Sequence, residues 1–70
     1  MKLSTRNQFA GTVTAITEGE AMAIVKIALD GTDVTVTSAI TIDGVKSLGL
    51  KVGDKAYALV KSTEVQVAVD

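Results

Sequence analysis

The sequence contains no cysteine, no histidine and no proline, and these absences exclude several kinds of protein. Without cysteine there is no disulfide framework, and without Cys or His the usual zinc and haem ligands are missing. The same two absences remove the nucleophile–base pairs of most hydrolytic active sites. We therefore expect a protein that is not an enzyme, has no cofactor and holds no metal cation.

Aromatic residues and long apolar runs are also scarce. Phe9 and Tyr57 are the only aromatics, the seven basic residues are scattered, and the net charge is −1. Single-strand nucleic-acid binding needs an aromatic stacking platform and a basic groove, so we expect no nucleic-acid partner. No uncharged apolar run approaches about 18 residues, and the first residues lack the apolar region of a signal peptide. We expect a soluble, cytoplasmic protein without membrane association.

The chain is short for the amount of apolar side chain it carries. Its 70 residues leave room for one domain, spanning residues 1–70, and 47% of them are hydrophobic. A domain of this size buries only about 60% of its unfolded surface, so a lone core is marginal. Because disulfides and metals are excluded as support, self-association remains, and we expect a homo-oligomer.

Stretches rich in Val, Ile and Thr, separated by short turn signals, predict an all-β fold. Apolar alternation favours strands at 9–17, 21–29, 34–40, 55–61 and 65–69. The strand at 21–29 has apolar residues on both faces, which predicts that it is covered on both sides.

One short helix is predicted between the third and fourth strands. Ile42, Val45 and Leu48 fall at helical spacing, Thr41 is placed to cap the helix, and Gly49 to end it. Five strands with a helix in this place is the element order of an OB-like barrel. A small SH3-like barrel gives a similar pattern, so periodicity alone leaves both open.

Two segments place cations beside hydroxyls with no acidic residue between them, at 4–7 and at 61–63. An ionised oxyanion only accepts hydrogen bonds, so it favours hydroxyls, backbone N–H groups, Arg and Lys. Thr41, at a helix start, is a third source of donors. The alternative is that the hydroxyls are only solvated or capping groups, and that Arg6 forms an ion pair with Glu64 or the C-terminal carboxylate.

Three blocks of the sequence, in this order, resemble the molbindins, or Mop domains, of molybdate-responsive regulators and transporter ATPases. The opening 4–8 is similar to their S-x-R-N-x motif. Residues 39–41 with 48–54 are similar to the middle of the family, and 58–65 to its ending. The blocks together cover nearly the whole chain.

The resemblance implies an OB-like barrel assembled as a hexamer, a trimer of dimers, that binds molybdate or tungstate between subunits for intracellular molybdenum storage and homeostasis. The family's ligand positions match Ser4, Arg6, Thr41, Lys61 and Ser62. At Gly44 the chain departs from several relatives, which have Ser three residues after the matching Thr. The competing hypothesis is an oligomerising regulatory or interaction module of the same fold that stores no anion.

We predict that oxyanion affinity is nearly constant between about pH 6 and 8, because Arg, Lys, hydroxyl and amide donors do not ordinarily titrate in that range. Molybdate itself is fully ionised there. Calorimetric titrations with molybdate across this range check the prediction. A steep pH dependence would mean that residues other than these build the site.

Overall fold

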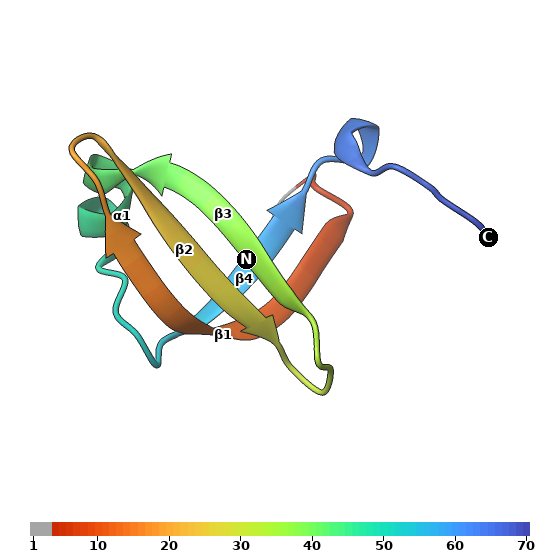
Figure 1. The fold of residues 1–70 in the computed structure, drawn as a ribbon, viewed down its shortest axis with the longest axis horizontal. Helices are drawn as coiled ribbons and strands as arrows, with labels where there is room; N and C mark the ends of the chain where they lie inside the picture. Colours follow the sequence, from red (N-terminus) through yellow and green to blue (C-terminus); the bar gives the residue numbers. More distant parts are fainter. Residues whose placement is uncertain (1–3) are drawn as a thin grey trace.

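The computed structural model describes residues 4–70 and is mostly β (Figure 1). Its elements are β1 (Asn7–Glu18), β2 (Met22–Leu29), β3 (Thr35–Thr41), α1 (Ile42–Leu48), β4 (Lys55–Val60) and the 3-10 turn η1 (Ser62–Glu64). The strands form one antiparallel sheet in the order β3-β2-β1-β4. The predicted all-β, OB-like class, with one short helix between the third and fourth strands, is confirmed.

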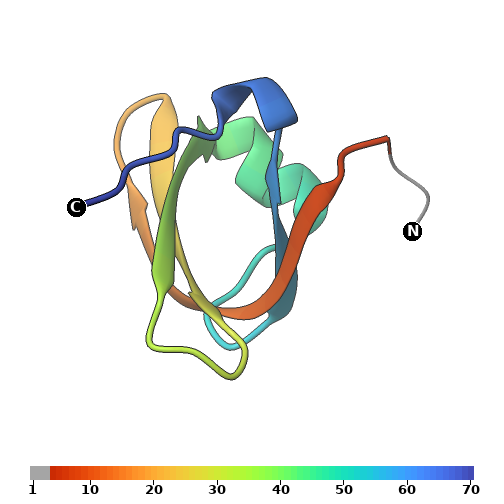
Figure 2. The same ribbon diagram turned by 90° about the vertical axis from the view of Figure 1, so that its right-hand side faces the viewer.

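The sheet curls into part of a barrel, with β3 and β4 as its two edges (Figure 2). Curling is concentrated in β1, whose register with β2 shifts between Val13 and Ala15. Such a β-bulge bends the strand and increases its twist. As a result β1 pairs with β4 along its first half and with β2 along its second.

The core lies inside the curl and follows from the alternation on β2. Ala23, Val25 and Ile27 are buried against Val13 of β1, together with Val45 of α1 and Ala58 of β4. Each buried valine or isoleucine contributes about 1.5 to 3 kcal/mol relative to an exposed side chain. The helix takes part in the core through Val45, which ties it to one end of the barrel.

The helix begins and ends where the sequence predicts. Thr41 is the N-cap in an extended conformation, and its Oγ1 accepts a hydrogen bond of 2.9 Å from the Gly44 backbone N–H. Gly49 ends the helix with φ of 63°, the left-handed conformation that glycine adopts without steric penalty.

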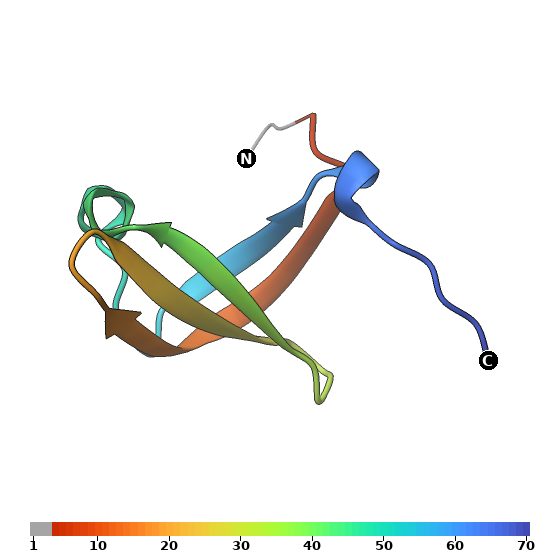
Figure 3. The ribbon, with the colours of Figure 1, turned by 45° about the horizontal axis from the view of Figure 1, so that its top comes forward.

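The predicted fifth strand is wrong for this structure, because residues 65–69 form no strand. After β4 the chain turns through η1 and leads away from the sheet (Figures 1 and 3). A strand exists only where its backbone groups pair with a neighbour, and alternation alone supplies no neighbour. Val67 is therefore 88% exposed and Val69 91% exposed.

The prediction that the strand at 21–29 is covered on both sides is also wrong for the single chain. Its outward side chains Met22 and Ile24 are 46% and 39% exposed. The described part of the chain contains two helices, of 7 and 3 residues, and neither is long and apolar enough to cross a membrane.

Gly11 of β1 lies in close contact with β2, and we predict that Gly11→Ala destabilises the fold. A Cβ there would lie 2.5 Å from the backbone oxygen of Ala28 and 2.6 Å from Ile27 Cγ2. Crowding of this kind costs about 1 to 3 kcal/mol of unfolding free energy. Urea denaturation at one fixed protein concentration measures it.

The control is Gly19→Ala, because a Cβ at Gly19 would meet only the Met22 carbonyl oxygen, at 3.3 Å. We expect a markedly smaller loss for this variant. Equal losses for the two variants would mean that the β1–β2 contact at Gly11 is not tight.

Candidate functional site

A cavity of about 490 Å³ lies where the N-terminal segment meets the turn after β4. Its lining consists of Ser4, Thr5, Arg6, Leu59, Lys61, Ser62 and Thr63. Four of the five site residues expected from the sequence are therefore brought together, although segments 4–7 and 61–63 are far apart in the chain.

Strand pairing explains this meeting. Asn7 and Val60 are register partners at the end of the β1–β4 ladder. Arg6 lies one position before that pair and Lys61 one position after it, so the two cationic residues leave the sheet side by side. The ladder thus sets the separation of the two segments.

The described residues that line the cavity are mainly cationic and hydroxylic, and none of them carries a carboxylate. Arg6 and Lys61 supply the positive charge, and Ser4, Ser62 and Thr63 supply hydroxyls that can donate to an anion. Arg6 and Lys61 are exposed to solvent. The arrangement suits a ligand that carries negative charge and only accepts hydrogen bonds.

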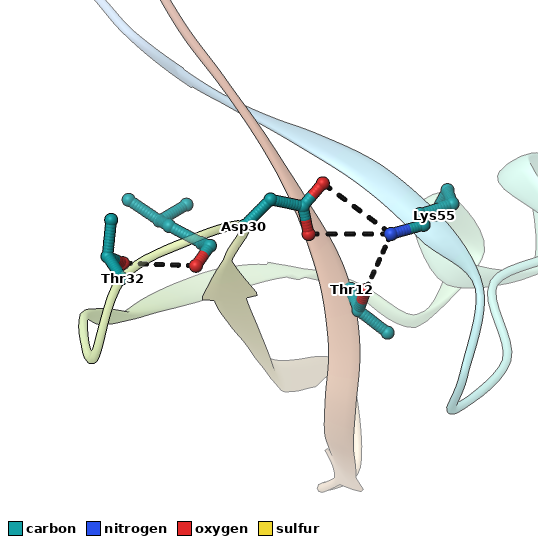
Figure 4. A network of polar contacts seen from close by, with 5 residues as sticks. Thr12, Asp30, Thr32 and Lys55 are labelled. Atoms are coloured by element: carbon teal, nitrogen blue, oxygen red, sulfur yellow. Dashed lines mark hydrogen bonds and ion pairs between the residues drawn. The ribbon is translucent and has the colours of Figure 1, made fainter.

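Neither cation of the cavity is engaged by an acidic side chain. Within residues 4–70, the one ion pair joins Lys55 Nζ to Asp30 Oδ1 at 3.4 Å, and the same Nζ donates to Thr12 Oγ1 at 3.3 Å (Figure 4). The alternative pairing of Arg6 with Glu64 or with the C-terminal carboxylate is absent from this part of the chain. Arg6 is thus open to a ligand.

Thr41, the fifth expected site residue, does not line the cavity. It stands at the start of α1, at the end of the molecule opposite η1 (Figures 1 and 3). Its hydroxyl accepts from the Gly44 N–H and keeps its own O–H available as a donor. Thr41 is exposed.

Gly44, where the sequence departs from the family pattern, adjoins that hydroxyl. A Cβ at this position would lie 3.2 Å from Thr41 Oγ1, closer than side chains ordinarily approach. Glycine therefore leaves the space beside the Thr41 hydroxyl open.

Sequence reasoning did not single out Leu59, which contributes an apolar wall to the cavity. It lies opposite Gln8 in the β1–β4 ladder, beside the N-terminal segment. The alternation within its own strand predicts only that it shares a face with Tyr57. Nothing in the local sequence indicates a place beside Arg6, because that depends on pairing with a distant strand.

These features define a small curled β-sheet domain with an open cavity, lined by cations and hydroxyls, beside one end of its β1–β4 strand pair. The chain belongs to the TOBE domain family, whose model matches residues 3–67. The resemblance to molbindins seen in the sequence is confirmed by the relatives below.

Over all 70 residues the chain is 44% identical to the whole of a Haemophilus influenzae protein named a probable molybdenum-pterin-binding protein. A solved molybdate-binding protein from Sporomusa ovata superposes with a TM-score of 0.89 at 45% identity, covering 99% of this chain and 100% of that one. The cytoplasmic molybdate-binding protein ModG, solved with molybdate bound, superposes with a TM-score of 0.84 at 41% identity. That match covers 91% of this chain and 45% of ModG.

Proposed function

We propose that this chain is a single Mop-type domain that binds molybdate or tungstate as the free oxyanion and catalyses no reaction. The observation that carries the proposal is the cavity in which Arg6, Lys61 and several hydroxyls meet, with no carboxylate among the described lining residues. The chain is similar along nearly its full length to proteins described as molybdate-binding, and this similarity supports the same ligand. A role in cytoplasmic molybdenum storage fits a binding protein without catalytic groups.

In this proposal Ser4, Arg6, Lys61 and Ser62 bind the anion from one copy of the chain, and Thr41 from another. A cavity of 490 Å³ is in the range of sites for drug-sized ligands, so one tetrahedral anion leaves much of it unfilled. Thr41 lies at the opposite end of the molecule, so its hydroxyl reaches the same anion only from a second copy.

Assembly is favoured by the apolar surface of the single chain. Met22 and Ile24 project outward from β2, and the residues after η1 expose further valines. Exposed apolar groups gathered on so small a domain are typical of protein interfaces. We propose a homo-hexamer, a trimer of dimers, with the anions held between subunits.

Selectivity in such a site comes from spacing and not from charge, because sulfate and molybdate carry the same charge and accept the same hydrogen bonds. Molybdate is the larger tetrahedron. Hydrogen-bond donors held at the strand ends of two copies cannot all reach the smaller ion, so some donors stay unpaired. Each buried donor left unpaired weakens binding by about 1 to 3 kcal/mol. Tungstate, nearly equal in size to molybdate, is bound equally well.

We predict that Arg6→Ala weakens molybdate binding by about 1.5 to 3 kcal/mol, the scale of a hydrogen bond to a charged group. Calorimetry with molybdate, tungstate and sulfate measures the loss. The control is Lys51→Ala, which removes an exposed cation that lies outside the cavity lining and leaves affinity unchanged.

Three results would contradict parts of this proposal. Unchanged affinity of Arg6→Ala together with a smaller assembly by light scattering would assign Arg6 to structure. Sulfate competing with molybdate at comparable concentration would show that the cavity is not tuned to size. A stable oligomer that takes up no anion would favour the interaction-module hypothesis.

A second prediction tests whether one site draws on two copies. Arg6→Ala and Thr41→Val each lose high-affinity binding when assembled alone. When equal amounts of the two variants are co-refolded, about one quarter of the sites combine an intact Arg6 from one copy with an intact Thr41 from another, since assembly is random. Calorimetric stoichiometry then shows a recovered tight fraction. If Thr41 and Arg6 acted within one chain, mixing would recover none.

A further inference from the structure

The two segments that line the cavity separate at one pair of residues. Asn7 is the first residue of β1, Val60 is the last residue of β4, and the two are register partners. Among residues 4–70, no strand pairing beyond this pair holds Arg6 beside Lys61. Because strand ends open more readily than strand centres, the geometry of the cavity depends on how firmly this last pair is closed.

A side chain reinforces this pair. Asn7 Nδ2 donates a hydrogen bond of 3.1 Å to the backbone oxygen of Val60, linking residues 53 positions apart in the sequence. Among the side-chain hydrogen bonds of residues 4–70, this one is partly buried and all the others are exposed to solvent. Partial burial limits competition from water, so this bond is better protected than the exposed side-chain hydrogen bonds of residues 4–70.

The neighbouring side chain acts on the N-terminal segment alone. Gln8 Nε2 donates to the backbone oxygen of Thr5, folding the chain back over Arg6. Two successive carboxamides therefore anchor the segment: Gln8 shapes it, and Asn7 attaches it to the end of β4. Neither Asn7 nor Gln8 lines the cavity.

We propose that Asn7 is a positioning residue for the oxyanion site, holding Arg6 and Lys61 at the separation that one tetrahedral anion bridges. This inference rests on the proposed function. Asn7 touches no ligand in this arrangement. It acts by keeping the final pair of the β1–β4 ladder closed, which removes motion that anion binding would otherwise have to suppress.

The test compares three variants of the full chain by molybdate calorimetry. Asn7→Leu keeps a similar shape but has no donor, and we expect affinity roughly three- to tenfold weaker, the fold-change equivalent of one net hydrogen bond. Asn7→Gln retains a carboxamide N–H and recovers part of that loss. Thr14→Val is the matched control, because it removes another β1 side-chain bond, from Thr14 Oγ1 to the Lys26 oxygen, away from the cavity.

A second measurement separates failure of this inference from failure of the proposed function. Amide hydrogen exchange at residues 58–60, the end of β4 in the β1–β4 ladder, is expected without anion to be faster in Asn7→Leu than in the wild type and unchanged in Thr14→Val. If the wild type takes up no molybdate but exchange is still faster in Asn7→Leu, the proposed function is overturned while the coupling of the two segments is supported. Wild-type affinity in Asn7→Leu, or unchanged exchange there, would overturn the inference.

Discussion

β1 is paired along its length with two different strands, and the rest of the structure depends on this double pairing. Its first half forms a ladder with β4 and its second half with β2, and a register shift near Thr14, within the β1–β2 ladder, bends the strand. Gly11 lies where the two ladders overlap, opposite both Leu29 and Ala56, at a contact too close for a side chain. If this strand were straight, β4 would move away from the core and Ala58 would lose its burial.

β1 also determines where the cationic side chains of the cavity lie. Its N-terminal end emerges beside the C-terminal end of β4, so Arg6 and Lys61 are brought together by backbone pairing and not by attraction to each other. Two cations in a cavity without a carboxylate repel each other, and exposure to solvent keeps that repulsion small. Enclosure of the cavity by a second copy would remove water and strengthen the attraction of both cations for an anion. Ligand binding and assembly are therefore expected to support each other.

The single chain leaves many large apolar side chains exposed, including some on β2 and some in the segment after η1. Met22 and Ile24 project from the outer face of β2, and Val67 extends from the tail after η1. A domain of this size has too little interior to bury these side chains itself. These exposed positions support the self-association that we propose.

Local patterns in the sequence by themselves determined β1 to β4, α1, the Thr41 cap and the Gly49 stop, because alternation, helical spacing and capping depend on residues close together in the chain. They also identified the residue types suited to an oxyanion. The tertiary structure alone decided that Arg6 and Lys61 share a cavity while Thr41 lies at the other end, since those distances follow from pairing between strands far apart in sequence. It decided as well that residues 65–69, despite their alternation, form no strand here, because a strand requires a partner that local sequence cannot supply.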